Sequence, residues 1–461
     1  MTALSPALLD ELRVVVGAQR VLTKPEELVV YGYDGAFMEG HPDVVVSPLT
    51  TEEVSKVMRI ADRERIPVAP RGAGTGLAGG SIPMQGGIAL NLAMMNRILE
   101  ISAADMCVVT QPGVITGVLQ TAVEKSGLFY PPDPASLNQC TIGGNVSTGA
   151  GGPRGLKYGV TKDYVLALEI VLANGETMRT GSRAIKNVTG YNLTQLFVGS
   201  EGTLGIVTEI TLRLIYKPPS KATVMAVFNR LDDACKTVGN VLGAGVVPLT
   251  TELMDNAVIR AVEDAFHLGL PVDADALLLI DVDGTPESVP AQQQRVSEVC
   301  EDSGAREVRV AKDAAEADAL WRARRDIYAA VMRIKPNILP EDVCVPRSAI
   351  PEMARRVQAL RDKYQLQIPM WGHIGDGNLH PCLMCDRRDA DEMRRVHAAI
   401  TELFADAIEL GGTLTGEHGI GLLKKEYLPM DLHPVAIAQM KALKKVFDPN
   451  GILNPGKLFP D

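Results

Sequence analysis

The sequence has no excess of positive charge. Its 46 lysines and arginines are outnumbered by 56 aspartates and glutamates, which gives a formal net charge of -10. Nucleic-acid binding depends on clustered lysine and arginine side chains that neutralise phosphates, so the composition argues against a nucleic-acid partner. A small anionic substrate stays compatible with this charge, because a few local cations are enough to hold it.

Cysteines and long apolar runs are also scarce. The seven cysteines are odd in number and mostly scattered, which favours a reduced, cytoplasmic setting over a disulfide framework. Cys382 and Cys385 form a single C-x-x-C, which indicates buried strand positions more than a metal site. No apolar run reaches the roughly 18 residues that a membrane-spanning helix needs, so membrane association would be peripheral and depend on a partner. Asp10 and Glu11 interrupt the first apolar stretch, so no signal peptide is expected.

At 461 residues the chain is long for one core, and about 150 residues per domain predicts two or three domains. The first part contains a predicted helix at 50–64, a strand at 66–70, a hairpin at 165–181 that turns at Asn174-Gly175, and an alternating strand at 206–214. Beyond residues 217–220 the glycine-rich loops stop, and helices at 231–243, 286–303 and 349–364 alternate with strands. Glycine-rich segments return after residue 411. We therefore predict domains at 1–216 and 217–410, and a C-terminal segment, 411–461, that packs back on the first domain.

The first glycine-rich loop matches the G-x-G-x-x-G spacing of dinucleotide-binding sites at residues 74–79. A Rossmann site requires a helix that begins at this loop, so that its N-terminus meets the pyrophosphate. Pro83 and the pair Gly86-Gly87 follow instead, and they do not fit the first turns of a stable helix. This excludes a Rossmann site, and the lack of a G-x-x-x-x-G-K-[ST] motif excludes a P-loop. Two interpretations stay open: a nest of backbone N–H groups that binds a pyrophosphate, or a mobile linker.

Four segments carry a family resemblance in a fixed order along the chain. They read PVAPRGAGTGLAGG, PPDPASLNQCTIGGNVSTGAGGPRGLKYG, LFVGSEGTLGIVTEITLRL and GILNPGK. Together they resemble the FAD-binding domain of the vanillyl-alcohol oxidase superfamily, in the branch with the glycolate oxidase flavoprotein subunit, D-lactate dehydrogenases and D-2-hydroxyglutarate dehydrogenase. The resemblance implies an α+β fold. It has a two-lobed FAD-binding domain, an α+β cap domain with an antiparallel sheet for the substrate, and a C-terminal segment that returns to the FAD domain.

The resemblance also implies how FAD is bound. Residues 71–76 would wrap the pyrophosphate, residues 201–206 would lie near the adenine half, and Asn454 would lie near the flavin ring. Some members attach FAD to a histidine of the first loop, but the matching residue here is Thr75, so non-covalent FAD is expected. The full set of expected cofactor contacts is Pro70, Arg71, Gly72, Ala73, Gly74, Thr75, Gly76, Pro132, Asp133, Gly143, Gly144, Asn145, Gly149, Gly159, Glu201, Gly205, Ile206 and Asn454.

Histidine is scarce, and three of the seven histidines fall in two glycine-rich motifs, WGHIGDGNLH (371–380) and GEHG (416–419). Asp376-Gly377 is typical of a two-residue hairpin turn, which would set His373 opposite His380 with Cβ atoms roughly 4.5–5.5 Å apart. Two such imidazoles can share a metal ion with Glu417 as third ligand, which suits Zn²⁺, Fe²⁺ or Mn²⁺. The alternative is that these histidines cap hairpins or fill a core. The family resemblance favours the metal site.

Three residues are expected to carry the remaining chemistry, and the resemblance gives roles to His418 and Arg324. His418 would take the hydroxyl proton of a 2-hydroxy acid while C2 delivers a hydride to FAD. Arg324 would bind the substrate carboxylate, with a solvated helix face as the alternative. Asn378 is expected to act with them. The hydroxyglutarate enzymes carry a lysine where this chain has Pro340, which favours a monocarboxylate such as D-lactate or glycolate.

The expected function is an FAD-linked dehydrogenase of a small 2-hydroxy acid. Because the chain has no iron–sulfur cysteine set, an external electron acceptor is expected, either an iron–sulfur subunit or an electron-transferring flavoprotein. One alternative is a D-2-hydroxyglutarate dehydrogenase. Another is a non-catalytic flavin subunit that only relays electrons, although an intact set of His373, His380, Glu417 and His418 argues against it.

Overall fold

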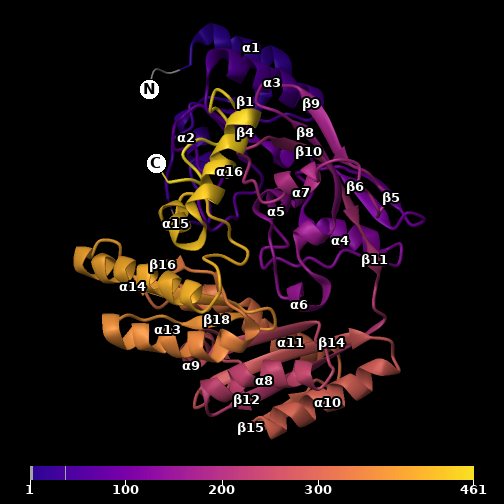
Figure 1. Ribbon diagram of the computed structural model, residues 1–461, viewed down its shortest axis with the longest axis vertical. Helices are drawn as coiled ribbons and strands as arrows, with labels where there is room; N and C mark the ends of the chain where they lie inside the picture. The colour runs from indigo at the N-terminus through magenta and orange to yellow at the C-terminus, as the bar shows by residue number, and fades with distance from the viewer. Residues whose placement is uncertain (1–3, 37, 461) are drawn as a thin grey trace. The chain divides into compact units, whose positions relative to one another are not determined.

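The computed structural model describes residues 4–36 and 38–460 (Figure 1). The chain divides into two compact units: Met1–Gly151, Val160–Lys217 and Glu417–Asp461 form the first, and Gly152–Gly159 with Pro218–Gly416 form the second. The C-terminal segment thus folds with the N-terminal part of the chain. Residues 152–159, which the sequence assigned to the first domain, group with the second unit. Residues 1–3, 37 and 461 of the predicted domains lie outside the described residues.

A four-stranded sheet begins the first unit. Its order is β1 (Val21–Leu22), β2 (Val44–Val46), β4 (Ile88–Asn91) and β3 (Val68–Arg71). The last three strands are parallel and β1 is antiparallel to β2. Helix α3 (Thr51–Glu64) shares a core with these strands, and the Thr50 side chain accepts the N–H of Glu53 at 3.2 Å, as the capping pattern predicts. Two further helices are α1 (Pro6–Val16) and α2 (Pro25–Leu28).

A five-stranded antiparallel sheet forms the second part of this unit. Its order is β5 (Ile98–Ser102), β6 (Cys107–Thr110), β10 (Ile206–Arg213), β8 (Val165–Val171) and β9 (Thr177–Gly181). The predicted hairpin is confirmed as β8 and β9, and Gly175 at its turn has a φ of +79°. The remaining elements are α4 (Thr116–Glu124), β7 (Leu128–Phe129), α5 (Ile142–Thr148), α7 (Leu193–Phe197) and β11 (Ile215–Tyr216).

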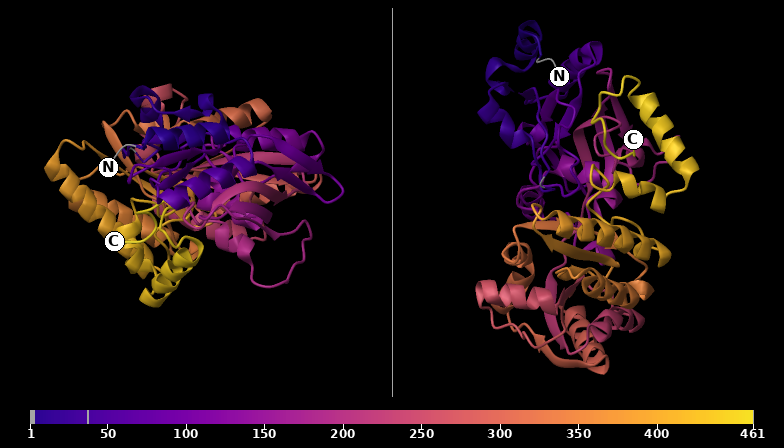
Figure 2. Two further views of the ribbon diagram at one scale, coloured as in Figure 1. Left: turned by 90° about the horizontal axis from the view of Figure 1, so that it is seen from above. Right: turned by 90° about the vertical axis from the view of Figure 1, so that its left-hand side faces the viewer.

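The C-terminal segment lies against these sheets through α15 (Leu428–Asp431) and α16 (Pro434–Phe447), drawn in yellow in Figures 1 and 2. The ring of Phe447 lies 5.1 Å from the ring of Phe197 on α7. Lys444 Nζ donates to the carbonyl oxygen of Thr203 at 2.7 Å, and Leu453 bridges to Val68 of β3. Residues 444–453 therefore contribute to the core of the first unit.

The second unit is built on an antiparallel sheet. Its main path runs β15 (Ala305–Val310), β12 (Ser220–Phe228), β14 (Ala276–Gly284), β13 (Thr250–Asp255), β18 (Met370–His373), β19 (Asn378–Cys385) and β16 (Asn337–Pro340), and β17 (Val343–Cys344) pairs with β19. All of the pairings are antiparallel, as expected for the cap domain.

Helices cover both faces of this sheet, because its alternating side chains are apolar on both sides. One face shares a core with α9 (Asn256–Phe266), α11 (Ala314–Arg325) and α12 (Ile327–Val331). The helices on the other side, in the foreground of Figure 1, are α8 (Leu231–Gly243), α10 (Ser288–Asp302) and α13 (Ile350–Tyr364). The predicted helices at 231–243, 286–303 and 349–364 are thereby confirmed to within two residues. A short helix, α6 (Gly155–Tyr158), is held on β14 by the Tyr158 hydroxyl, 2.9 Å from Asp283.

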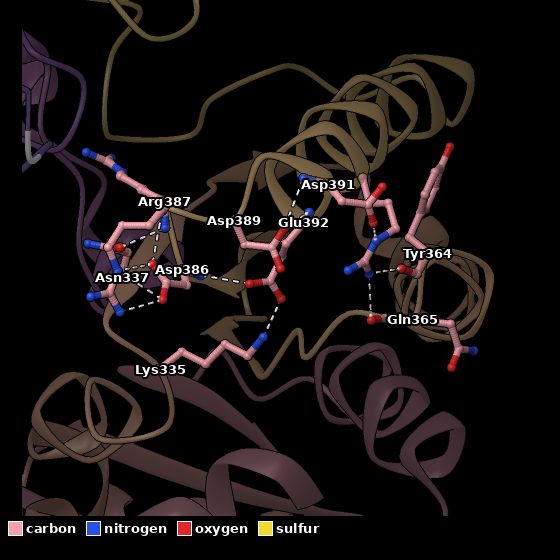
Figure 3. Close-up of polar contacts among 11 residues, drawn as sticks. Lys335, Asn337, Tyr364, Gln365, Asp386, Arg387, Asp389, Asp391 and Glu392 are labelled. Atoms are coloured by element: carbon pink, nitrogen blue, oxygen red, sulfur yellow. Dashed lines mark hydrogen bonds and ion pairs between the residues drawn. The ribbon is translucent and has the colours of Figure 1, made fainter.

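Helix α14 (Ala390–Glu409) begins in a network of polar side chains (Figure 3). Asp389 accepts the N–H groups of Asp391 and Glu392, each at 3.0 Å. Glu392 in turn accepts the N–H of Asp386 at 2.8 Å and forms an ion pair with Lys335. These bonds satisfy the free N–H groups at the start of the helix. Within the described ranges, every helix is too short or too polar to cross a bilayer.

Candidate active site

Three neighbouring strands of the second unit place an acid and two histidines on one face of the sheet. Glu252 of β13 lies opposite His373 of β18, and Trp371 of β18 lies opposite His380 of β19. Side chains two residues apart on a strand share a face, and so do directly opposed residues. Glu252, His373 and His380 therefore project from the face that α9, α11 and α12 cover. All three side chains are buried.

The register between β18 and β19 differs from the predicted one. The expected two-residue turn, with His373 directly opposite His380, is wrong, because the turn takes the four residues Ile374–Gly377. Gly377 has a φ of +91°, and Val345 donates its N–H to the Gly377 carbonyl oxygen at 3.0 Å. The geometry of the turn is therefore set by this contact with a distant segment and not by the local Asp-Gly pattern. His373 lies diagonally to His380, and their ring centroids are 5.1 Å apart.

Each of these histidines has a buried carboxylate beside Nδ1. Glu252 Oε1 lies 2.7 Å from His373 Nδ1, and Asp342 Oδ1 lies 3.6 Å from His380 Nδ1. Burial of Glu252 favours its neutral form, but the charge of Arg324 and the hydrogen bonds from His373 and Arg324 hold its pKa below the usual carboxyl range. Glu252 is therefore an ionised group inside the protein.

Arg324 reaches the same carboxylate from α11. Its Nε–H donates to Glu252 Oε2 at 2.6 Å, and its side chain is 12% exposed. Its neighbours instead form ion pairs at the surface, Arg322 with Asp326 and Arg325 with Asp318. Of the three arginines in the last turn of α11, Arg324 is the one directed at the histidine pair.

Asp342 is fully buried and organises the segment before Glu417. Its Oδ1 atom accepts the Asn378 side-chain N–H at 2.6 Å, and Oδ2 accepts the Thr415 hydroxyl at 2.6 Å and the Gly416 N–H at 3.0 Å. Asn378, expected among the catalytic residues, thus uses its amide to hold Asp342.

Glu417 and His418 follow Gly416 directly, so this anchoring keeps them close to Asp342. One ligand atom from each of Asp342, His380, Glu417 and His418 lies within 4.8 Å of the others. Two of the three predicted metal ligands, His380 and Glu417, therefore belong to one group of donor atoms. His373 is outside this group of four, although its ring lies close to that of His380.

The first glycine-rich loop lies in the first unit. It follows β3 without a helix among the described residues 72–91, in agreement with the exclusion of a Rossmann site. Gly74 and Gly79 have positive φ angles of +72° and +79°. A Cβ atom on Gly72 would overlap the Thr141 hydroxyl, so this loop is in close contact with the N-terminus of α5. The N–H groups of residues 74–76 donate to no other described residue, which leaves them available for phosphate oxygens.

The other expected cofactor residues occupy several segments of the chain. Pro70 and Arg71 end β3, Ala73 and Thr75 lie in the first loop, Pro132 and Asp133 follow β7, and Gly143, Gly144 and Asn145 lie in α5, with Gly149 at its end. Gly205 and Ile206 lie at the start of β10, and Gly159 ends α6 in the second unit. The Arg71 guanidinium donates to the carbonyl oxygen of Tyr33 at 2.6 Å and that of Val30 at 3.3 Å, so its side chain holds the 30–33 segment.

Glu201 and Asn454, the last two of the expected set, connect the C-terminal segment to the rest of the first unit by hydrogen bonds. Glu201 accepts the N–H groups of Ile420 and Gly421, each at 2.8 Å, and burial raises its pKa. Asn454 donates to the carbonyl oxygens of Glu201 at 2.7 Å and Gly80 at 2.8 Å. Both residues have positive φ angles, +51° and +43°, which side chains other than glycine adopt only under such constraint. Their side chains therefore fix the backbone that follows His418.

Two family descriptions match the chain. The family described as "FAD binding domain" matches residues 42–181, and the family described as "FAD linked oxidases, C-terminal domain" matches residues 217–458. The chain belongs to the FAD-linked oxidases. The two matched regions follow one another along the chain in the order that the sequence motifs indicated.

Relatives of this FAD-linked oxidase match over nearly its whole length. The glycolate oxidase subunit GlcD of Bacillus subtilis (strain 168) is 48% identical, over 94% of this chain and 92% of the relative. The D-lactate dehydrogenase of Anaerostipes hadrus is 37% identical, over 94% and 91%. The D-2-hydroxyglutarate dehydrogenase of Stutzerimonas stutzeri (strain A1501) is 33% identical, over 98% and 99%.

Solved structures confirm the fold class of this FAD-linked oxidase. The crystal structure of p-cresol methylhydroxylase with substrate bound matches with a TM-score of 0.83 at 20% identity, and the match covers 99% of this chain and 96% of that chain. At that identity the likeness shows the fold alone. The predicted α+β fold of the vanillyl-alcohol oxidase type, with an antiparallel sheet in the second unit, is confirmed.

The sequence did not single out Glu252 and Asp342, although both are central to the candidate site of this FAD-linked oxidase. Glu252 lies in the strand TTELMD, where an acid at a core-facing position was a signal. Asp342 follows Glu341 between apolar residues, which was a similar signal. Buried acids of this kind require partners, and those partners become visible only with the sheet register.

Proposed function

We propose that this FAD-linked oxidase is a dehydrogenase that oxidises a small 2-hydroxy carboxylate, D-lactate or glycolate, to the 2-oxo acid. The observation that carries the proposal is the arrangement of the histidine pair. Nδ1 of each histidine lies beside a buried carboxylate, and one of these carboxylates also anchors Arg324. The names of the relatives, a glycolate oxidase subunit, a D-lactate dehydrogenase and a D-2-hydroxyglutarate dehydrogenase, support this substrate class.

A divalent metal ion fits the residues around His380. A histidine whose Nδ1 faces a carboxylate presents Nε2 for coordination, which is the usual arrangement at metal sites. Two imidazoles on one tetrahedral ion have ring centres about 5 Å apart. The centroids of His373 and His380 are 5.1 Å apart, and Glu417 offers a ligand atom in the same group as His380. His373, His380 and Glu417 would hold Zn²⁺, Fe²⁺ or Mn²⁺.

The chain's own residues divide the remaining tasks. When bound, FAD would supply the hydride acceptor for substrate C2, and a metal ion held by His373, His380 and Glu417 would supply a Lewis acid for the substrate hydroxyl. His418, which belongs to the same group of side chains as His380, accepts the hydroxyl proton. Arg324 binds the carboxylate through its terminal nitrogens and thereby orients C2. Asn378 supports the site by holding Asp342.

FAD binding is proposed to be non-covalent, because Thr75 offers no ring nitrogen for a covalent bond. The electrons are proposed to leave to a separate acceptor, an iron–sulfur subunit or an electron-transferring flavoprotein. The seven cysteines are scattered along the chain, and their positions offer no set of ligands for an iron–sulfur cluster of the chain's own.

Pro340 supports a monocarboxylate substrate. It ends β16 opposite Cys382 and is buried without a charge. This position therefore supplies no cation for a second carboxylate. A D-2-hydroxyglutarate dehydrogenase remains the second candidate, because one relative bears that name.

The test is an anaerobic titration of the purified, FAD-loaded protein with D-lactate, L-lactate, glycolate and D-2-hydroxyglutarate, following flavin absorbance. We expect D-lactate or glycolate to reduce the flavin at the lowest concentration, and a metal chelator to stop the reduction. Preferential reduction by D-2-hydroxyglutarate would select the second candidate. If none of the four acids reduces the flavin, the proposal is wrong, and the non-catalytic flavin subunit is supported.

A further inference from the structure

Glu252 contacts two side chains to which the proposed function gives separate tasks. It has no exposed surface, and its two carboxylate oxygens have different partners. Oε1 lies 2.7 Å from His373 Nδ1, and Oε2 accepts the Nε–H of Arg324 at 2.6 Å. The sheet register sets the first contact, because Glu252 and His373 are opposed residues of β13 and β18. The second contact comes from α11, which packs on the same face of the sheet.

We propose that Glu252 is a positioning residue that fixes the tautomer of His373 and the orientation of Arg324 together. This inference rests on the proposed function. An arginine side chain keeps its proton in proteins, so Nε must donate to Glu252. The carboxylate paired with it is ionised and only accepts hydrogen bonds. His373 must then donate from Nδ1, and the neutral imidazole with its proton on Nδ1 is the tautomer whose Nε2 lone pair can bind a metal ion.

The same bond prepares Arg324 for a carboxylate ligand. Glu252 engages only Nε, and the two terminal nitrogens of Arg324 donate to no other residue of the described chain. A guanidinium held at Nε keeps its plane fixed while its terminal nitrogens remain free for the two oxygens of a carboxylate. The Arg324 side chain is mostly buried, so little water competes for the hydrogen bond that fixes its orientation.

Glu252 also links the electrostatics of the two tasks. Its negative charge offsets the positive charge of Arg324 when no substrate is bound, which reduces the cost of burying the guanidinium. A substrate carboxylate is then recognised chiefly by the direction of the hydrogen bonds. Loss of Glu252 should therefore affect metal retention and substrate affinity at once, although the two ligands bind to different side chains.

The decisive variant is Glu252→Gln. An amide offers one acceptor and one donor, whereas His373 Nδ1–H and Arg324 Nε–H both need an acceptor. If the amide oxygen faces Arg324, its NH₂ group faces His373, and His373 must move its proton to Nε2. We expect this tautomer change to lower the zinc content after dialysis, and KM for D-lactate or glycolate to rise roughly 10-fold to 100-fold, the scale of an unmatched buried hydrogen bond.

Nitrogen-15 NMR of histidine-labelled, FAD-loaded protein reads the tautomer directly, with the His373 signals assigned by their absence in His373→Gln. The matched control is Glu392→Gln, which changes another buried, ion-paired glutamate of the same unit (Figure 3). It should lose stability without changing the His373 signals, the zinc content or KM. Glu252→Asp retains two acceptor oxygens on a shorter arm and should recover the Nδ1–H tautomer.

Arg324→Lys separates the two effects. It should raise KM and leave the His373 tautomer unchanged. A Glu252→Gln protein with the wild-type His373 signals, zinc content and KM would overturn the inference. If Glu252→Gln does not fold, Glu252→Asp decides, and wild-type KM and zinc content together with an Nε2–H tautomer would count against the proposal. Failure of the wild-type protein to be reduced by any 2-hydroxy acid would refute the proposed function, while the NMR measurement would still decide the role of Glu252.

Discussion

At the scale of single residues, the two histidines of the candidate site differ in how they meet their carboxylates. Glu252 lies within hydrogen-bond distance of His373 Nδ1, whereas Asp342 is 3.6 Å from His380 Nδ1, beyond a normal hydrogen bond. The carboxylate oxygens of Asp342 accept hydrogen bonds from Asn378, Thr415 and Gly416. Glu252 therefore orients a ring, and Asp342 orients the chain that leads to Glu417 and His418.

His418→Ala tests the assignment of the base. Without an imidazole to accept the hydroxyl proton, we expect the rate of flavin reduction by D-lactate or glycolate to fall roughly 10²-fold to 10⁴-fold. Anaerobic stopped-flow measurement of flavin absorbance gives this rate directly. His397→Ala, at an exposed position of α14, is the control and should react like the wild type. A near-normal rate in His418→Ala would remove this residue from the proton transfer.

Asp342→Asn tests the anchor of the following segment. Three donors converge on Asp342, from Asn378, Thr415 and Gly416, and an asparagine would turn an N–H group toward at least one of them. We expect a loss of about 1–3 kcal/mol in the stability of this arrangement. Bound metal and kcat should both decrease, as measured by metal analysis and steady-state assays.

The control for Asp342→Asn is Asp283→Asn. Asp283 is also buried in the second unit, but it holds the Tyr158 hydroxyl instead of the segment before Glu417. This variant should lose stability and keep its metal. Equal metal loss in the two variants would mean that the effect of Asp342→Asn is a general loss of stability.

At the scale of elements, local sequence patterns predicted helices and turns correctly where neighbouring residues alone decide the structure. The Asn174-Gly175 hairpin, the capped helix at 50–64 and the amphipathic helices of the second unit all follow from neighbouring residues. The Asp376-Gly377 turn did not, because the backbone of Val345, distant in sequence, bonds to Gly377. Glu252 and Asp342 were missed for the same reason, since their partners come from other strands and helices.

Gly76→Ala tests whether the first glycine-rich loop binds FAD through its backbone. A Cβ atom on Gly76 would meet nothing within 4 Å, and this glycine does not have a positive φ. The FAD-free protein should therefore keep its unfolding temperature. FAD affinity, measured by flavin fluorescence, should fall roughly 10-fold, because the added methyl group would stand where a pyrophosphate approaches.

The control for Gly76→Ala is Gly239→Ala, at an exposed position of α8 that is also open. It should raise stability slightly, because alanine favours a helix over glycine, and should leave FAD affinity unchanged. Wild-type FAD affinity in Gly76→Ala would favour the interpretation of this loop as a linker.

At the scale of the whole molecule, the first unit depends on residues from both ends of the chain. The Glu201 carboxylate accepts the N–H groups of Ile420 and Gly421. The Asn454 side chain donates to the carbonyl oxygens of Glu201 and Gly80. Lys457 donates to Asn454 Oδ1 at 2.5 Å and is 4% exposed. A charged lysine is thus buried where the C-terminal segment meets the core, and this predicts a pH dependence of stability.

Burial lowers the pKa of Lys457 to about 8, and the charges of Asp34 and Glu201 oppose this shift only in part. An unfolded lysine has a pKa of about 10.4. Between these values the unfolded chain binds a proton that the folded chain lacks, so the free energy of unfolding rises with pH. Below about pH 8 the cost of burying the charge is fully present, and above about pH 10.4 it is absent; the difference is about 3 kcal/mol.

Lys457→Met removes this titration, so the unfolding temperature of the wild type should rise relative to that of the variant from pH 7 to 10. Other groups titrate equally in both proteins, and a constant difference across this range would mean that Lys457 is not neutralised by burial.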